Sequence, residues 1–293
     1  MRWKQLASFM TSKWCARVGL AILIIISLLA VFADQLSPYD PNAVTGRPLE
    51  PPNTRHLLGT DDAGRDILSE LLHGSRATLT VGFTAALISV LLGTLIGATA
   101  GYIGGLVDEV LMRFTDAWLS IPPLLFAVFM VSSLSIRGRV NSIVSIILAI
   151  ALTSWPGVAR VVRACVLSLR EAQYVEAARA LGCSETRILF VHILPTMAPL
   201  IVAEVAARVA VAMIAEASLS FLGVGDPSIV SWGSMLRFAL LRNAIVLGYW
   251  WWFLPPGIMI SITVLGVILV GMGLEEYINP KITMARVRYG NSK

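Results

Sequence analysis

Long uninterrupted runs of apolar residues are the main pattern along this chain. A helix needs about 20 residues to cross the hydrocarbon core of a bilayer. The runs that approach this length lie at residues 16–35, 78–103, 110–134, 142–159, 197–222 and 253–274. Trp155-Pro156 interrupts the fourth run, so its second boundary stays open. The pattern predicts an all-α polytopic membrane protein with six transmembrane helices.

The first run raises the alternative of a cleaved secretory signal, because basic residues precede it. A signal peptide needs small residues at its cleavage site. The run ends in Val31-Phe32-Ala33-Asp34, which is a poor site. We therefore predict that the run remains as the first transmembrane helix.

Composition supports a membrane protein and narrows the chemistry. Hydrophobic residues make up 56% of the 293 residues and charged residues 14%, with a mean hydropathy of +0.76. About a quarter of a globular domain is charged. The cysteines and histidines form no CxxC pair and no metal-ligand spacing. They are Cys15, Cys165, Cys183, His56, His73 and His192. A disulfide framework or a metal site is therefore not expected, and each histidine should be solvated or locally hydrogen-bonded.

Basic residues gather in three segments, which set the predicted orientation. The segments are residues 2–17, 160–187 and 281–293. Lys and Arg concentrate on the cytoplasmic side of membrane proteins, and six spans place all three segments on one side. Both termini are therefore predicted to be cytoplasmic, while the acidic first loop faces outward. Arg137 and Arg139 lie in the one short loop that opposes this rule.

The predicted spans divide the chain into three parts. Residues 1–75 hold a cytoplasmic N-terminal segment, the first span and a proline-rich outer loop, which is predicted to be an extended, hydrated strap with helix-like residues 61–72. Residues 76–275 form a core of five spans, and residues 276–293 form a cytoplasmic tail. The tryptophans at 250–252 are expected at the headgroup level, where they would anchor the last span.

The second span carries glycines at a regular spacing. Gly93, Gly97 and Gly101 are four residues apart, and Gly105 continues the series. This spacing keeps the glycines on one helix face, where another helix can approach closely. Tight helix packing is the prediction, and a gating hinge is the alternative.

A stretch rich in Ala, Glu, Leu and Arg, at residues 169–195, separates spans four and five. These residue types favour helix. Gly182 suits a left-handed C-terminal cap, and Ser184 can cap a following helix. Two short helices joined by a turn are predicted. The pattern also resembles a DNA-binding helix-turn-helix, but neighbouring spans leave no room for the packed domain of a DNA reader, so no nucleic-acid partner is expected.

Within this stretch, Glu176-Ala177-Ala178, Gly182 and Leu194-Pro195 resemble the EAA motif of ABC importer permeases. His192 stands where the general motif has an apolar residue, as in the peptide-permease branch. The resemblance implies a type I importer permease bundle, in which this segment is a coupling helix that docks on an ATPase subunit. The implied docking residues are Glu176, Ala177, Ala178, Arg179, Gly182 and Arg187.

Further stretches resemble the C-type permease of dipeptide, oligopeptide or nickel systems. They lie at residues 56–66, 101–109, 121–123, 216–223, 231–233 and 274–280. The resemblance implies an inner-membrane complex of a bacterium or archaeon, with a homologous second permease, two ATP-binding subunits that hold ATP and Mg, and an extracytoplasmic substrate-binding protein. This chain itself is expected to hold no cofactor. Peptides are the expected solute, and nickel or other metal chelates and oligosaccharides are the alternatives.

No catalytic chemistry is predicted for this chain. It lacks a GxxxxGK[ST] phosphate loop. Gly223-Val224-Gly225 has no flanking strand and helix that would support a dinucleotide site. ATP hydrolysis is therefore expected in the partner subunits.

Charged residues inside the fifth predicted span are Glu204, Arg208 and Glu216. Glu204 and Arg208 are four residues apart and can form an ion pair, and Glu216 lies within about 120° of the same helix face. Charged groups in a membrane face a bundle interior or a water-filled path, so internal pairing and contact with the translocation path both stay open. A secondary transporter driven by an ion gradient, with these residues as a proton relay, is the rival function.

Overall fold

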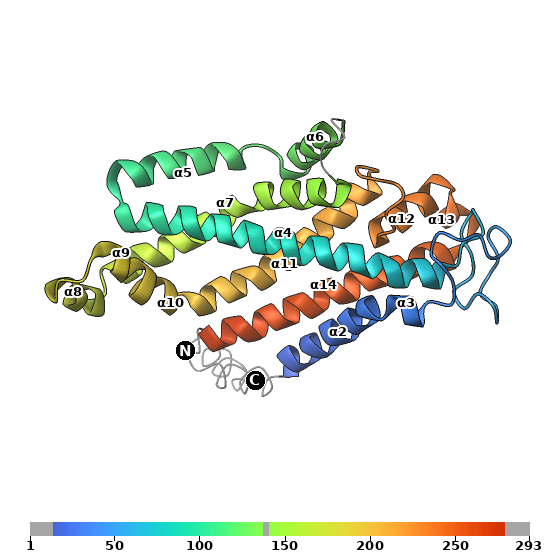
Figure 1. Ribbon diagram of the computed structural model, residues 1–293, viewed down its shortest axis with the longest axis horizontal. Helices are drawn as coiled ribbons and strands as arrows, with labels where there is room; N and C mark the ends of the chain where they lie inside the picture. The colour runs from blue at the N-terminus through green and yellow to red at the C-terminus, as the bar shows by residue number, and fades with distance from the viewer. Residues whose placement is uncertain (1–13, 137–140, 279–293) are drawn as a thin grey trace, which may run out of the picture.

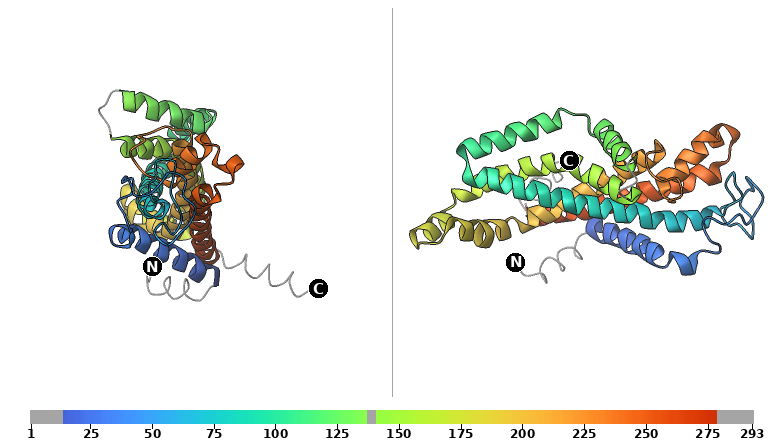
Figure 2. Two further views of the ribbon diagram at one scale, coloured as in Figure 1. Left: turned by 90° about the vertical axis from the view of Figure 1, so that its right-hand side faces the viewer. Right: turned by 45° about the horizontal axis from the view of Figure 1, so that its top comes forward.

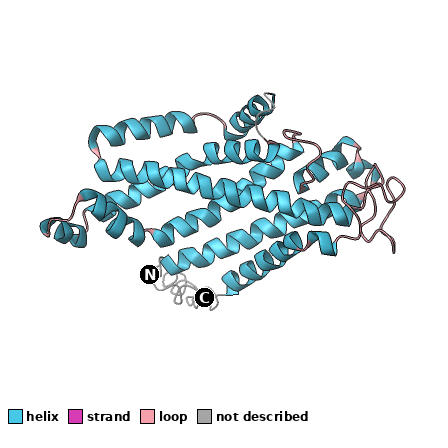
Figure 3. Cartoon of the chain, in the orientation of Figure 1, coloured by secondary structure: helices cyan, strands magenta, loops and turns pink. Residues whose placement is uncertain are grey.

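The computed structural model describes residues 14–136 and 141–278, and helices joined by loops make up this part of the chain (Figure 3). Extended pairing in the described residues is limited to two isolated bridges in and beside the loop 37–66. The helices are α2 Trp14–Val31, α3 Ala33–Leu36, α4 Ile67–Ile103, α5 Gly105–Leu119, α6 Pro123–Ile136, α7 Ser142–Arg170, α8 Gln173–Ala180, α9 Glu185–Arg187, the π-helix η1 Ile188–Ile193, α10 Leu194–Thr196, α11 Ala198–Phe221, α12 Trp232–Leu241, α13 Ala244–Leu247 and α14 Trp250–Ile278.

The long helices run along the length of the molecule, and different elements lie at its two ends (Figures 1 and 2). One end carries α8, α9 and α10 and is called the α8 end below. The opposite end carries the loop 37–66, α12 and α13 and is called the loop end.

Among the described residues, five helices are long and apolar enough to cross a bilayer, namely α2, α4, α7, α11 and α14. The pair α5 and α6 makes a sixth span if it is counted as one, so the predicted all-α membrane fold with six spans is confirmed on that count. The third predicted span, 110–134, is nevertheless wrong as a single helix, because α5 and α6 are bent by 86°. Pro122 and Pro123 lie at the break, where proline removes backbone donors and disfavours helix in the residue before it.

The fourth span is not broken at its proline, because the helix α7 continues through Pro156 to Arg170. A proline inside a helix leaves the carbonyl four residues earlier without its usual donor. Here that carbonyl belongs to Leu152, and it accepts a hydrogen bond of 2.7 Å from the Trp118 indole nitrogen of α5. A neighbouring helix therefore satisfies the freed group, as is common inside membranes.

α4 begins earlier than predicted and has no break near Arg76. It runs for 37 residues, about 55 Å, which exceeds the roughly 30 Å of a bilayer core. Asp66 caps its first turn by accepting from the Ser69 backbone N–H at 2.9 Å. The helix-like stretch predicted in the outer loop is thus partly the start of α4.

The prediction of an extended strap is wrong, because the loop 37–66 folds back on itself, while most of its proline-rich start is exposed as predicted. Asp61 is fully buried and accepts from the Arg65 backbone N–H at 2.7 Å. His56 is buried and lies 2.9 Å from the Asp66 carboxylate. Buried polar groups need such partners, and these contacts fix the loop as a cap on the end of α4.

The tryptophans at the start of α14 are not a lipid anchor as a group. Trp251 and Trp252 are 9% and 1% exposed and belong to the core, whereas Trp250 is 50% exposed. Of the three tryptophans, only Trp250 is exposed enough for the predicted headgroup anchor, and the other two pack α14 against the loop end.

Glycines set the closest helix contact, between α4 and α7. A Cβ built on Gly93 would lie 2.5 Å from the Val158 side chain, and one on Gly101 would lie 2.8 Å from the Arg163 carbonyl oxygen. This arrangement is the tight packing that the sequence predicts. Gly105 does not continue the face, because it starts α5 with a φ of +55°.

Candidate functional site

The segment after α7 folds as two short helical pieces around a glycine turn, as predicted. Gly182 has a φ of +79°, the left-handed conformation that favours glycine. Its N–H donates to the Arg179 carbonyl at 2.9 Å, and the Cys183 N–H donates to the Ala178 carbonyl at 3.1 Å. These two bonds make a Schellman motif. Ser184 then caps α9 by accepting from the Arg187 N–H at 3.4 Å.

The outward face of this segment carries most of the predicted docking residues. Glu176, Ala177, Arg179, Gly182 and Arg187 are exposed. The buried face packs into a core cluster with α7 and η1, and it includes Val175, Ala178, Val166, Ile188 and Ile193. Ala178 therefore supports the segment from inside, which corrects its predicted place on the docking surface.

A hydrogen-bonded link ties the segment to the end of α4. The Tyr102 hydroxyl of α4 donates to the Glu185 carboxylate of α9, and the Arg179 guanidinium approaches the same carboxylate at 3.3 Å. The Tyr102 hydroxyl, and then Arg179, hold the pKa of Glu185 below its usual value, so the carboxylate stays ionised at neutral pH. Sequence reasoning missed Tyr102 because it lies far away in the chain.

Ion pairs on α5 brace α7, which leads into the segment. Asp108 contacts Arg163 at 2.5 Å, and Asp116 contacts Arg160 at 2.6 Å. α7 and α8 are separated by two residues, Glu171 and Ala172. The segment is thus connected to α4 through Tyr102, to α7 through the chain, and to α5 only by way of α7.

Glu204 and Arg208 form the ion pair that their spacing allows. The carboxylate and guanidinium are 3.4 Å apart, and the two side chains are 15% and 23% exposed. The guanidinium also packs against α7, because a Cβ built on Gly157 would lie 3.0 Å from it. Glu216 lies eight residues further along α11, about 12 Å away along the axis. The three charged residues therefore do not form one cluster.

We expect Glu204→Ala or Arg208→Ala to destabilise the protein by on the order of 1–3 kcal/mol, because each change leaves a partly buried charge without its partner. The double substitution should cost less than the worse single one. The measurement is a double-mutant cycle on the thermal unfolding midpoint and on the amount of assembled protein. Glu171→Ala, at an exposed carboxylate, is the control, and additive losses at 204 and 208 would show that the pair contributes nothing.

Comparison with known proteins identifies the family. The family described as the binding-protein-dependent transport system inner membrane component matches residues 93–284, and the N-terminal TM domain of oligopeptide transport permease C matches residues 3–52. The chain belongs to this binding-protein-dependent permease family. It is a transmembrane subunit of an ABC importer, and importers of this family work with ATPase and substrate-binding partners.

Relatives match along nearly the whole chain. The oligopeptide transport system permease protein OppC of Bacillus subtilis is 36% identical over 96% of this chain and 90% of its own length. The di/tripeptide transport system permease protein DppC of Pseudomonas aeruginosa is 38% identical over 91% of this chain and 88% of its own. A putative peptide transport system permease protein of Brucella abortus is 40% identical over 92% and 88%.

Among solved structures, an inward-facing methionine ABC transporter, MetNI, has a chain 18% identical to this permease. It aligns with a TM-score of 0.48 and covers 66% of this chain and 96% of its own.

Proposed function

We propose that this permease forms half of a translocation path for peptides and that residues 173–187 couple the path to an ATPase subunit. The observation that carries the proposal is the exposed face of Glu176, Ala177, Arg179, Gly182 and Arg187 on a segment tied to α4 and α7. Small residues permit close docking, and charged residues can make contacts at the rim. The names of the relatives, which are peptide permeases, favour peptides over metal chelates or oligosaccharides.

The proposed complex contains this permease, a homologous second permease, two ATP-binding subunits and an extracytoplasmic substrate-binding protein. ATP and Mg would bind in the ATP-binding subunits, where hydrolysis would take place. ATP-driven closure of these subunits would push on the exposed segment. Because the segment continues into α7 and is held to α4, the helices of the path would move with it.

Uptake by the reconstituted complex tests this proposal. Proteoliposomes that contain the complex should accumulate labelled dipeptide or oligopeptide only with ATP and the loaded binding protein. An ionophore that removes ion gradients should leave uptake unchanged. Uptake that follows an ion gradient without ATP would instead support a secondary transporter. Competition by nickel chelates or oligosaccharides, but not by peptides, would show that these compounds and not peptides are the solute.

The α8 end and both termini are proposed to face the cytoplasm. Residues 160–187 at the α8 end are basic, and the terminal segments 2–17 and 281–293, which lie largely outside the described residues, are basic as well. The loop end would then meet the binding protein.

Thiol labelling checks this orientation. We expect a membrane-impermeant reagent outside intact cells or right-side-out vesicles to label Thr45→Cys in the loop 37–66 but not Cys183 or Thr186→Cys. Thr186 is exposed whereas Cys183 is half-buried, so Thr186→Cys tests the same side of the membrane at a site that the reagent can reach. Permeabilised membranes should label Thr186→Cys, and labelling of that site from outside would reverse the proposed topology.

A further inference from the structure

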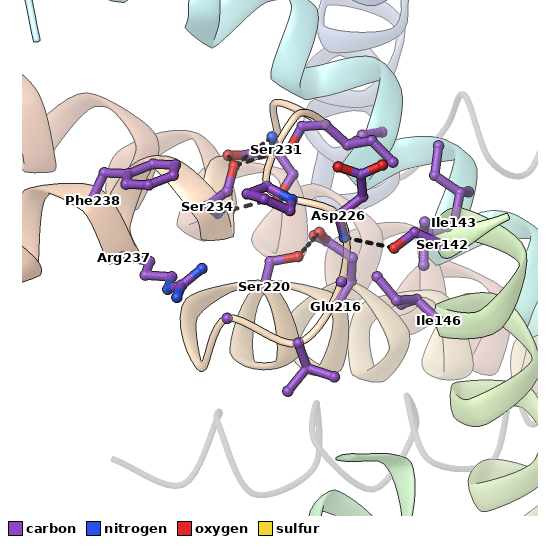
Figure 4. A pocket seen from close by; sticks show the side chains of 17 residues that line it. Ser142, Ile143, Ile146, Glu216, Ser220, Asp226, Ser231, Ser234, Arg237 and Phe238 are labelled. Carbon is purple, nitrogen blue, oxygen red and sulfur yellow. Dashed lines mark hydrogen bonds between the residues drawn. The ribbon is translucent and has the colours of Figure 1, made fainter. Parts of the chain in front are cut away.

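A small cavity lies at the loop end, beside the C-terminal turns of α11 (Figure 4). Residues from α4, the first turns of α7, the turn 223–231 and α12 complete its wall. Its polar lining includes Ser142, Ser220, Ser231, Ser234, Asp226 and Arg237. The centres of water-sized molecules can occupy about 30 Å³ of it, which is room for one or two waters or a small ion but not for a peptide.

Glu216 supplies a buried carboxyl to this cavity. The residue is 2% exposed, and its Oε1 accepts a hydrogen bond of 2.8 Å from the Ser220 hydroxyl. Among the described residues, its Oε2 has no hydrogen-bond partner. The hydroxyls of Thr78 on α4 and Ser231 lie beside the same carboxyl, and Thr78 Oγ1 also lacks a partner in the described chain. A buried oxygen without a partner is costly, and a buried carboxylate more so.

The hydrogen bonding of the carboxyl disfavours a bare negative charge at this place. Within the part of the chain that the structure describes, the one side-chain bond to Glu216 comes from a neutral hydroxyl. Arg237 lines the cavity but packs over Gly223 and lies 5.9 Å from the Phe238 ring. A cation on the carboxyl would remove this cost.

A second hollow offers a way to reach the cavity from the surface of the loop end. It is open to the outside and is lined in part by His73, Arg76 and Ser228. The hollow and the cavity share three wall residues, Ala77, Ile143 and Ile229. The hollow and the cavity are therefore adjacent.

We propose that Glu216, with the hydroxyls around it, is a binding site for one small monovalent cation, H⁺ or Na⁺, that enters from the loop end. Every polar side chain that lines the cavity, except Arg237, presents oxygen, the ligand type that hard cations prefer. A bound cation connects α11 with α4 and the turn 223–231, so it stabilises the packing of the loop end.

Other charged groups near this route behave differently. The Ser228 hydroxyl, and then its backbone N–H, hold the pKa of Asp226 below its usual value, so Asp226 stays ionised over the neutral range. His73 lies at the outer hollow and contacts Asp34 at 3.1 Å. Arg76 binds the same Asp34 carboxylate at 2.8 Å. His73 and the buried Glu70 are the groups that must be controlled in a pH experiment, so that experiment uses a background that carries His73→Asn and Glu70→Gln.

The experiment measures the thermal unfolding midpoint of the purified complex, which needs no transport and therefore stands apart from the proposed function. One arm replaces choline by Na⁺ at constant pH and ionic strength. Saturable stabilisation on the order of 2–4 °C, absent in Glu216→Gln, would identify Na⁺ as the occupant. Glu204→Gln, on the same helix but outside the cavity, should keep the full response.

The other arm varies pH in choline alone. If H⁺ is the occupant, the folded protein holds a proton that the unfolded chain releases, so the midpoint falls as pH rises. The fall should persist in the background that carries His73→Asn and Glu70→Gln and vanish when Glu216→Gln is added to it, and difference infrared spectra should lose a protonated-carboxyl band with this last change. If Glu216→Gln does not assemble, Ser220→Ala, which removes the one bonded hydroxyl, should weaken the same response. The proposal is overturned by two results together. The wild-type midpoint does not change with Na⁺, and its dependence on pH is the same in Glu216→Gln or Ser220→Ala.

Discussion

Gly182→Val is expected to reduce ATP-driven uptake at least tenfold while the subunit still reaches the membrane in normal amount. Gly182 holds a φ of +79°, and apart from its two chain neighbours no described residue has an atom within 4 Å of the place where a Cβ would stand. The Cβ of a valine there would therefore meet no residue outside the turn, so its main effect is on the backbone. The left-handed conformation costs a β-branched residue about 1–2 kcal/mol. That cost is small for a six-helix bundle, but it redirects the turn that positions Glu176 and Arg187.

The matched control is Gly182→Asn, since asparagine tolerates the left-handed conformation and should keep most of the uptake. Glu176→Lys reverses an exposed charge on the same face without straining the turn. It should also reduce uptake, through weaker ATPase binding or through hydrolysis that the loaded binding protein no longer stimulates. Subunit stoichiometry, stimulated ATPase activity and uptake are measured on the same purified complexes. Normal coupled uptake in both Gly182→Val and Glu176→Lys would remove the coupling role from this segment.

Local features of the coupling segment could be predicted because short-range chemistry determines them. Gly182 and Ser184 specify their turn and cap through bonds to residues within five positions. Glu204 and Arg208 meet because one helical turn separates them. The link from Tyr102 to Glu185 joins residues 83 positions apart, and no sequence period brings such residues together. The turn and cap of the segment were therefore predictable, and its attachment to α4 was not.

The prolines show the same limit within the spans. Pro122-Pro123 lies at the 86° break, whereas Pro156 sits inside a continuous helix. The residue type is the same in both places. The difference at Pro156 is a partner from another helix, the Trp118 indole on the Leu152 carbonyl. Such a partner depends on how α5 lies against α7, which a hydropathy profile does not contain.

Apolar runs also do not distinguish lipid-facing residues from core residues, because lipid tails are as apolar as leucine side chains. The three tryptophans at 250–252 are equal in hydropathy, yet only Trp250 is half-exposed. Proline density likewise suggested an extended strap in the loop 37–66, where the buried Asp61 and His56 instead hold a compact cap. The sequence likewise did not show that Glu216 lies in a different environment from the Glu204–Arg208 pair, because hydropathy does not reveal which neighbours a side chain has.

Gly97→Ala is expected to lower the thermal unfolding midpoint by on the order of 5 °C and to reduce the amount of assembled protein severalfold. A Cβ on Gly97 would overlap the backbone carbonyl oxygen of Ala159 on α7. A backbone atom cannot rotate away, so α4 and α7 must separate. Overpacking of this kind costs about 1–3 kcal/mol.

The neighbours of Gly97 make that separation harder to absorb locally. The glycines at 93, 97 and 101 face the carbonyls of residues 155, 159 and 163, so the same four-residue step repeats on both helices. Movement at one position therefore opens the other two. Gly257→Ala is the matched control, because a Cβ on this glycine of α14 would have no atom of the described residues within 4 Å apart from its chain neighbours and its own helix backbone. Alanine favours helix over glycine by about 1 kcal/mol, so the same substitution should be neutral or stabilising at 257 and harmful at 97. Equal midpoints for the two variants would show that close approach of α4 and α7 does not limit the stability of this permease.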